Sequence, residues 1–112
     1  MMKVLVCGGR DYADSAKVAA VLNEIDPLVV INGGAPGADT LASGWAITHN
    51  VPYVEIKANW GKDGKAAGPI RNQRMIDKCK PDLVVAFPGG RGTADMVARA
   101  RKAGVSVREV TP

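Results

Sequence analysis

Five short apolar runs, separated by segments with helical periodicity, constrain the fold of this chain more than any other feature. The runs are Lys3–Cys7, Pro27–Ile31, Tyr53–Ile56, Asp82–Phe87 and Val105–Glu109. Most are nearly continuous Val, Leu and Ile, which is typical of parallel strands that are buried on both faces. Because strands alternate with helices, we expect an α/β three-layer sandwich of about five parallel strands in the order 3-2-1-4-5, with helices on both faces.

Four helices are predicted between these runs. Asp14 is expected to be the N-cap of the first helix, and Trp45 lies on the apolar face of the second. The third helix is expected over Arg71–Lys80. The fourth is expected over Thr93–Ala103, with Thr93 as its N-cap and Gly104 at its C-terminal end.

The composition limits the classes of function. A chain of 112 residues suits one domain, residues 1–112, with a single core. No apolar run approaches the ~20 residues needed to span a bilayer, and the first run is too short for a signal peptide. We therefore expect a cytoplasmic protein without a membrane partner.

The two cysteines and the single histidine predict neither a metal site nor a bound cofactor. Cys7 ends a strand and Cys79 lies late in a helix, and neither has a second ligand pair nearby. Both are expected to be reduced, buried thiols. His49 alone does not complete a zinc site or a histidine-based triad, so we assign it no catalytic task.

The net charge of +4 is concentrated in one segment. Between Lys57 and Arg74 there are five cations and one acid, so this segment alone sums to +4 and the rest of the chain balances. The segment indicates either an anionic ligand or partner, or a solvated loop with lysines for solubility. Its first part, 57–69, is expected to be a loop without a helix of its own, and such loops often act as lids. Trp60 in this loop either stacks on a base or anchors the loop onto the body.

Glycine-rich loops follow three of the strands, and none of them is a Walker A motif. In the loop after the fourth strand, the chain passes from Pro88 into a helix, which brings unpaired N–H groups to the end of a buried strand. Glycine lets a ligand approach the backbone, and the helix dipole favours an anion. Ligands of such sheets bind at the carboxyl ends of the strands, at the switch point, so we expect a phosphorylated ligand there. The residues expected to contact it are Gly8, Gly9, Arg10, Gly33, Gly34, Gly37, Asp39, Arg71, Asn72, Pro88, Gly89, Gly90, Arg91, Gly92 and Thr93.

These loops also carry a family resemblance. The stretches GGRDY (8–12), GGAPGAD (33–39), GPIRNQRM (68–75) and PGGRGT (88–93) resemble those of the SLOG superfamily, and in particular its YspA, cpYpsA-related branch. The resemblance implies a Rossmann-like fold that binds a nucleotide or a nucleotide-derived ligand in a sensor or signalling role. It also implies a homo-oligomer, because relatives of this fold generally pair as dimers or higher assemblies.

The LOG enzymes of this superfamily suggest an alternative function. They are phosphoribohydrolases of nucleoside monophosphates, and they carry Pro-Gly-Gly-x-Gly-Thr-x-x-Glu and an arginine four residues before a methionine. Arg71 and Met75 reproduce the second pattern, whereas Met96 stands in the place of the glutamate. N-glycoside cleavage needs a carboxylate near the ribose. If the chain is a hydrolase, the candidate catalytic residues are Asp95, Asp39 and Arg71.

The second alternative is the binding of single-stranded nucleic acid. GAPGAD (34–39) is similar to a segment of the DprA family, and 69–76 resembles the Arg-Asn-containing helix start of that family. The basic segment would suit a DNA backbone. Few aromatic side chains are available for base stacking, so we expect a small nucleotide-derived molecule rather than nucleic acid as the partner.

Several of the candidate side chains have a structural alternative. Arg71 either contacts phosphate with its forked guanidinium or forms an internal salt bridge. Arg91 either contacts phosphate or is a solvated or subunit-interface arginine. Asp39 either complements the N-terminus of the second helix or binds ribose hydroxyls. Asp11 either orients Arg10 or meets the ligand.

Overall fold

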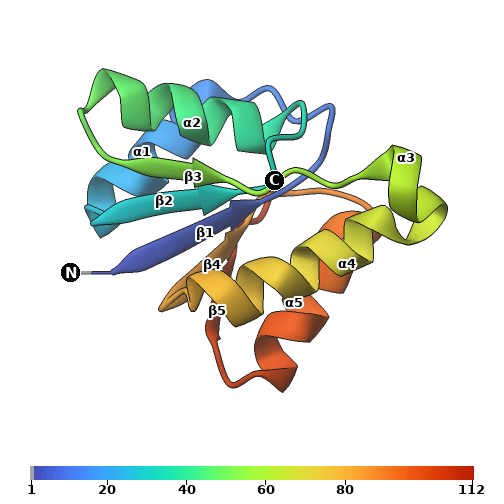
Figure 1. The fold of residues 1–112 in the computed structure, drawn as a ribbon. Helices are drawn as coiled ribbons and strands as arrows, with labels where there is room; N and C mark the ends of the chain where they lie inside the picture. The colour runs from blue at the N-terminus through green and yellow to red at the C-terminus, as the bar shows by residue number, and fades with distance from the viewer. Residues whose placement is uncertain (1) are drawn as a thin grey trace.

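The computed structural model describes residues 2–112 and contains one five-stranded parallel sheet. The strand order is β3-β2-β1-β4-β5, and helices cover both faces (Figure 1). The expected α/β, Rossmann-like architecture and strand order are therefore confirmed. The strands are β1 (Lys3–Cys7), β2 (Val29–Asn32), β3 (Tyr53–Glu55), β4 (Leu83–Ala86) and β5 (Ser106–Glu109).

The helices form the two outer layers, with α1 and α2 on one side of the sheet and α4 and α5 on the other (Figure 1). Asp14 is the N-cap of α1, as predicted, and its Oδ1 accepts a hydrogen bond from the N–H of Lys17 at 3.0 Å. No helix within residues 2–112 is both long and apolar enough to cross a membrane. The helices are α1 (Ser15–Ile25), α2 (Ala38–Thr48), α3 (Trp60–Asp63), α4 (Ala67–Arg74) and α5 (Arg91–Lys102), with a 3₁₀ turn at Gly64–Ala66 and a π-helical turn at Met75–Cys79.

The core has two halves, one on each face of the sheet. Side chains alternate along β1, so that Val4 packs with α1 and α2, whereas Leu5 and Cys7 pack with α5 and the π-helical turn. β1 is the central strand, and Leu5 pairs with Ile31 of β2 and with Val84 of β4. The chain leaves β1 toward one edge and returns to β4 on the other side. The switch point therefore lies between β1 and β4, as expected.

The helix before β4 begins earlier than the sequence pattern predicted. It starts at Ala67 rather than Arg71, and Pro69 lies in its first turn. Proline is tolerated there because the first N–H groups of a helix have no intrahelical partner. The π-helical turn continues this helix to Cys79, and Lys80 ends it with a φ of 47°.

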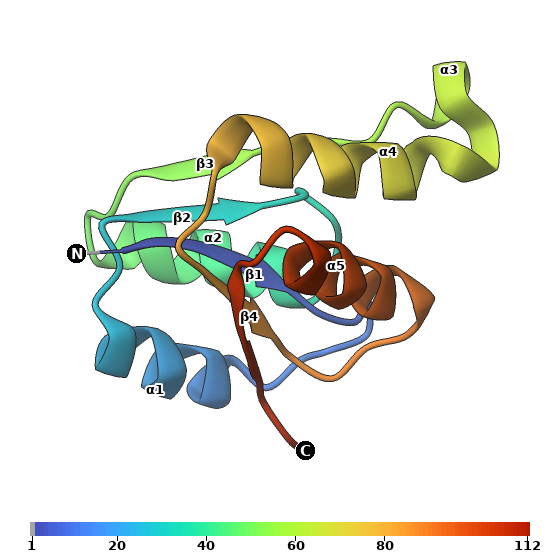
Figure 2. The ribbon, with the colours of Figure 1, turned by 90° about the horizontal axis from the view of Figure 1, so that it is seen from below.

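The segment 57–69 is not a loop without a helix of its own, so that expectation was wrong. Asn59 caps a short helix, and its Oδ1 accepts a hydrogen bond from the N–H of Lys62 at 3.0 Å. This local asparagine cap lets α3 begin at Trp60, and the 3₁₀ turn then leads directly into α4. Figure 2 shows α3 projecting beyond the end of the sheet, carried by the start of α4.

The start of α5 also differs from the prediction. The helix begins at Arg91, so Thr93 lies in its first turn and is not the N-cap. Gly90 takes that position and provides no side-chain hydrogen bond. The threonine was a reasonable N-cap by residue type, but glycine is also accepted at N-caps. At the other end, Gly104 has a φ of +77° and closes the helix as expected.

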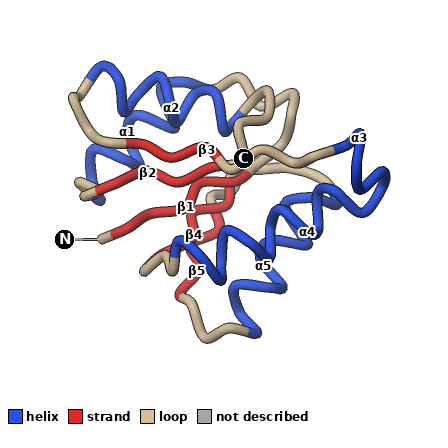
Figure 3. Tube along the Cα trace, in the orientation of Figure 1, coloured by secondary structure: helices blue, strands red, loops and turns tan. Residues whose placement is uncertain are grey.

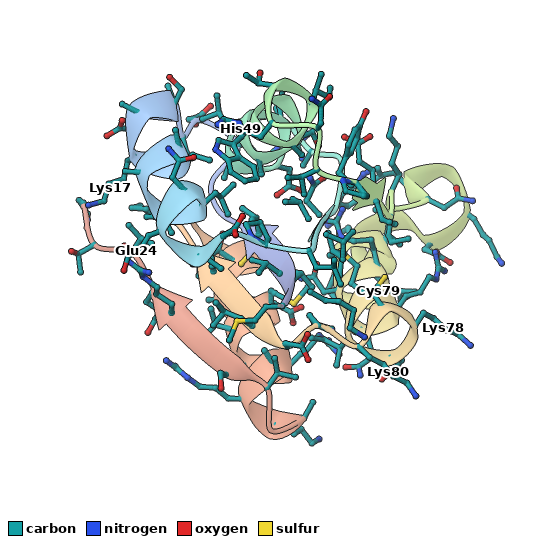
Figure 4. The ribbon with its side chains drawn as sticks, turned by 90° about the vertical axis from the view of Figure 1, so that its left-hand side faces the viewer. Lys17, Glu24, His49, Lys78, Cys79 and Lys80 are labelled. Carbon is teal, nitrogen blue, oxygen red and sulfur yellow. The ribbon has the colours of Figure 1, made fainter. Side chains whose placement is uncertain are left out.

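The loops after β1, β2 and β4 gather at one end of the sheet (Figure 3). α2 and the α4 helix both begin near this end and run away from it. His49, at the end of α2, and Cys79, at the end of the π-helical turn, therefore lie away from these loops (Figure 4). The ring of His49 stacks on Trp45 with 4.4 Å between centroids, and Trp45 is in the core as predicted. His49 is thus part of the packing at this helix end.

Candidate functional site

A cavity of about 580 Å³ opens where the three glycine-rich loops gather. Its volume is within the range of roughly 300–1,000 Å³ that is typical of small-molecule pockets. The starts of α4 and α5 and the segment around α3 complete its walls. The predicted ligand residues that line it are Gly8, Gly9, Arg10, Gly33, Asp39, Arg71, Asn72, Gly90, Arg91, Gly92 and Thr93, together with Asp95.

The predicted ligand residues Gly34, Gly37, Pro88 and Gly89 do not line this cavity. Gly37 has a φ of +83°, and a Cβ at this position would collide with the carbonyl oxygen of Gly9. The carbonyl oxygen of Pro88 accepts a hydrogen bond from the N–H of Gly9 at 2.9 Å. These contacts join the loops after β1, β2 and β4 to one another. Gly37 and Pro88 therefore hold the cavity wall in place without contacting the cavity.

Among the remaining lining residues, Trp60 had base stacking as one of its two expected roles, and the other seven were not assigned to the site from the sequence. Lys65 belongs to the basic segment, whose charge was the signal that pointed to it. Met75 was noted only for its spacing from Arg71, and Val6 gave no signal, because an apolar residue below a cavity has the same pattern as any core residue. The full set is Val6, Cys7, Ala35, Trp60, Lys65, Gly68, Pro69 and Met75.

The N-terminus of α5 opens directly on the cavity. Its N-cap, Gly90, forms no side-chain hydrogen bond, and its first turn contains no acidic residue. A Cβ built on Gly90 or Gly92 would meet nothing within 4 Å, so there is open space beside both residues. The first N–H groups of a helix have no partner within the helix and carry the positive end of its dipole. This end of the cavity therefore favours an anion.

Arg71 is held beside this helix end in a fixed orientation. Its Nη1 donates to the carbonyl oxygen of Gly33 at 2.8 Å, and its Nε donates to Oδ1 of Asn72 at 3.0 Å. A guanidinium has five N–H groups, so three remain for a ligand. Arg71 forms no salt bridge with any acid in the described range 2–112, and the internal-pair alternative therefore fails. Burial lowers the pKa of Arg71, partly offset by the nearby charge of Asp39, while Arg10 lowers it further.

Asn72 connects α4 to the start of α5. Its Nδ2 donates to the carbonyl oxygen of Gly92 at 3.2 Å and to Oδ2 of Asp95 at 3.0 Å. Because its Oδ1 accepts from Arg71, this buried amide uses both of its donors and its acceptor. Asn72 thereby fixes the distance between Arg71 and the first turn of α5.

Asp39 is the buried acid of the cavity, with an exposed fraction of 7%. Its Oδ2 accepts hydrogen bonds from the N–H of Gly33 at 3.0 Å and of Ala35 at 3.2 Å. No hydrogen bond within residues 2–112 reaches its Oδ1, and every buried side-chain polar atom there has a partner. Oδ1 is therefore not completely buried. The carboxylate holds the loop after β2 in place and also presents an acceptor at the cavity.

The environment of Asp39 disfavours its charge. Burial raises the pKa of this carboxyl from 3.8 to about 6, although the hydrogen bonds from Ala35 and Gly33 and the charge of Arg71 act against the rise. Glu55 adds to it. A buried acid with a strongly shifted pKa in a cleft is typical of functional sites.

A second set of hydrogen bonds, buried or partly buried, supports the same loop. Nδ2 of Asn32 donates to Oγ of Ser43 at 2.8 Å, and this hydroxyl donates to Oε2 of Glu55 at 2.9 Å. Oδ1 of Asn32 accepts from the N–H of Gly34 at 2.8 Å. Sequence analysis did not identify these three side chains, since each comes from a different element. Together they fix the turn that carries Gly33.

Asp95 lines the cavity but is engaged by its neighbours. Its Oδ2 accepts from Nε of Arg99 at 2.8 Å as well as from Asn72. Burial alone would raise the pKa of Asp95, but the hydrogen bonds from Arg99 and Asn72 and the charge of Arg99 outweigh it and lower the pKa. Met96, the next residue, is 1% exposed and packs in the core. This helix therefore presents a stable carboxylate at position 95 and no acid at position 96.

The charges around the cavity are mostly positive. Four cationic side chains line it, namely those of Arg10, Lys65, Arg71 and Arg91, against the acids Asp39 and Asp95. Arg10 and Asp11 do not form an ion pair with each other, since the pairs within residues 2–112 join Arg99 to Asp95, Arg101 to Glu109 and Arg108 to Glu24.

Cys7 lies in the cavity wall and is not suited to act as a nucleophile. Burial, followed by the charges of Asp39 and Glu109, raises the pKa of its thiol to about 12, and the reactive species of cysteine is the thiolate. Cys79 is only half-buried, which differs from the expectation of a buried thiol. No group of three or more His, Cys, Asp or Glu side chains in residues 2–112 could hold a metal ion.

Asp39 should make stability depend on pH. Well below pH 3.8 the residue is protonated in the folded and the unfolded chain. As the pH rises from 3.8 toward 6, the unfolded chain loses this proton first, so the folded state loses stability. Asp39→Asn should therefore raise the free energy of unfolding at neutral pH by up to roughly 3 kcal/mol and flatten its pH dependence. Urea unfolding from about pH 4 to pH 7.5 measures this. Asp11→Asn, at an exposed position, is the control. A less stable Asp39→Asn variant at neutral pH would contradict the argument.

Comparison with known proteins identifies relatives along the whole chain. A model of the YspA, cpYpsA-related SLOG family matches residues 2–62. Gene 61 protein of Mycobacterium phage D29 is 38% identical over 119 aligned positions, which cover 96% of this chain and 94% of the phage protein.

Solved structures show the same fold at lower identity. The DNA processing protein A (DprA) of Streptococcus pneumoniae superimposes with a TM-score of 0.80 at 20% identity, over 98% of this chain and 50% of that one. UDP-N-acetylglucosamine 2-epimerase superimposes with a TM-score of 0.64 at 16% identity, over 97% of this chain and 33% of the epimerase. MurG of Acinetobacter baumannii superimposes with a TM-score of 0.56 at 16% identity, over 97% of this chain and 34% of MurG. The chain thus spans half the length of DprA and about a third of the other two, and this likeness concerns the fold alone. On the family match and the phage relative, the chain belongs to the YspA, cpYpsA-related SLOG family.

Proposed function

We propose that the cavity binds a nucleotide or a nucleotide-derived ligand whose phosphate lies at the N-terminus of α5. The observation that carries this proposal is the pairing of that helix end with Arg71. The helix end has no side-chain cap and no acid in its first turn, and Arg71 is oriented beside it with free N–H groups. Backbone N–H groups and a forked guanidinium are the donors that suit phosphate oxygens.

The acids of the cavity give the ligand an orientation. The carboxylate of Asp39 is at the start of α2 and repels a phosphate there, so the anionic group belongs at α5. The free Oδ1 of Asp39 suits a hydroxyl donor, such as a ribose hydroxyl. Arg10, Lys65 and Arg91 add positive charge at the rim. A small molecule with an anionic end and a sugar fits this distribution better than a free phosphate does.

Binding rather than turnover is the function that this arrangement supports best. Hydrolysis of an N-glycoside requires a carboxylate that steadies a cationic ribose, and Asp95 is already bonded to Asn72 and Arg99. Hydrolysis by a LOG-like mechanism is the second candidate because Asp39 retains an open oxygen and a raised pKa. A sensor or signalling role and a homo-oligomeric state remain predictions from the family resemblance, and a cytoplasmic location remains a prediction from the sequence composition.

Ligand-dependent stabilisation tests the binding proposal. Thermal unfolding of the purified chain should shift with one class of small nucleotide from a panel of nucleoside mono-, di- and triphosphates, NAD, ADP-ribose, cyclic nucleotides and a short DNA single strand. A ligand at 100 times its dissociation constant adds about 2.7 kcal/mol. Arg71→Ala should abolish the shift. Arg74→Ala, on the same helix but outside the cavity, should retain it. A shift with the DNA strand alone would favour nucleic-acid binding instead.

Gly92 tests the position of the phosphate. Gly92→Ala places a methyl group in the open space beside the first turn of α5. It should lower the affinity for the ligand by about tenfold or more, as the loss of a charge-assisted hydrogen bond does. Folding stability should stay equal or rise by up to about 1 kcal/mol, because alanine suits a helix better than glycine. Gly44→Ala is the matched control, since its Cβ also meets open space but lies in α2, outside the cavity. Unchanged binding by Gly92→Ala would place the anion elsewhere.

Hydrolysis is tested by incubating the chain with nucleoside monophosphates and measuring the released free base by chromatography. We expect no release above the rate without protein. Release that is lost in Asp39→Asn and retained in Asp11→Asn would replace the binding function by hydrolysis with Asp39 as the carboxylate. Release that depends on Asp95 instead would contradict the structural role given to that residue.

A further inference from the structure

Trp60 is a large aromatic side chain that the fold leaves half uncovered at the rim of the cavity. Its exposed fraction is 54%, and it is one of the residues that line the cavity. It is the first residue of α3, which is anchored by the Asn59 cap and leads through the 3₁₀ turn into α4. Figures 1 and 2 both show α3 next to the start of α4, beyond the end of the sheet. A single exposed aromatic side chain is common on protein surfaces, but this one is exposed where it can meet a ligand in the cavity.

Anchoring of the α3 segment does not account for Trp60. The other tryptophan, Trp45, shows what a structural indole looks like in this chain. It is 8% exposed, it packs in the core, and its Nε1 donates to Oδ1 of Asn23 at 3.0 Å. Trp60 belongs to neither core cluster, and no hydrogen bond to its indole occurs within residues 2–112. A tryptophan that served only to hold this segment would bury its rings in the same way as Trp45.

The surroundings of Trp60 keep its ring beside the start of α4. A Cβ built on Gly68 would lie 3.5 Å from Cη2 of Trp60, so the six-membered ring lies close to this glycine. Gly68 and Pro69 continue the cavity wall from Trp60 and add no charge to it, and Lys65 is the cation at this rim. This wall therefore combines an aromatic face with small neutral residues, unlike the wall formed by Arg71 and α5.

We propose that Trp60 stacks on the aromatic base of the bound ligand and thereby selects base-containing nucleotides over sugar phosphates; this rests on the nucleotide-binding function proposed above. The polar parts of the ligand are accounted for by the other walls. The phosphate belongs at α5 beside Arg71, and the sugar hydroxyls belong at Asp39. The base is then the only part of the ligand without a place in the cavity. The wall around Trp60 is apolar and has no other proposed contact, so it suits the aromatic ring of the base. Stacking tolerates any base, because every base has a π-face.

The test compares ligands with and without a base. Binding of AMP, GMP, CMP, UMP and ribose 5-phosphate is measured by titration calorimetry on the wild-type chain, Trp60→Ala and Trp60→Phe. Trp60→Ala should weaken the best-bound nucleoside monophosphate by roughly 5- to 100-fold, which is the usual cost of removing a stacking aromatic. Trp60→Phe should restore most of the affinity. Ribose 5-phosphate should bind all three forms equally. Tyr53→Ala, which removes an aromatic of similar exposure outside the cavity, should bind as the wild type does.

Fluorescence gives an independent readout. Because Trp45 is buried, the accessible emission comes from Trp60, and a stacked base should quench it, whereas ribose 5-phosphate should not. Equal affinity of the wild type and Trp60→Ala for nucleoside monophosphates, without quenching, would overturn this inference and leave nucleotide binding intact. Failure of the wild type to bind ribose 5-phosphate or any nucleotide of the unfolding panel would instead overturn both proposals.

Discussion

A short chain of hydrogen bonds through Arg71 and Asn72 is the interaction on which the site depends. It begins at the carbonyl of Gly33 after β2, passes through the two side chains at the start of α4, and ends on the first turn of α5. These elements come from distant parts of the sequence, and the sheet alone does not fix their separation at its open end. A buried amide such as Asn72 costs about 1–3 kcal/mol for each polar group left unpaired, so the network holds its geometry only when complete.

This network divides the cavity electrostatically. The start of α5 and Arg71 form a positive end, whereas the Asp39 carboxylate already occupies the start of α2. The two helix N-termini would otherwise be equivalent anion sites at the same end of the sheet. The burial of Asp39 disfavours its charge and destabilises the folded state at neutral pH. Under the proposed function, this cost in stability would be the consequence of keeping an acid at the ligand site.

The fold was largely predictable from the sequence, and the site only in part. Continuous apolar runs alternating with helical patterns determine the strand order, because parallel strands and right-handed crossovers leave few arrangements. Helix starts were less predictable. Proline and glycine are typical of loops, yet Pro69 lies in the first turn of α4 and Gly90 is the N-cap of α5. The glycine loops were recognisable by composition. The supports of these loops were not, because Asn32 and Ser43 carry no local signal and meet only through the sheet.

The first turns of α5 differ from the LOG pattern at the position of the glutamate. The phosphate of the proposed ligand would need only backbone N–H groups and space at this turn, and there is open space beside Gly90 and Gly92. Catalysis in the LOG enzymes adds a glutamate three residues after the threonine, and here that position is Met96, which packs between the sheet and the helix. An adjacent acid does not replace it, because one residue rotates a side chain by about 100° around a helix. Asp95 accordingly meets Asn72 and Arg99, so its charge stabilises the wall that orients Arg71 instead of a reacting sugar.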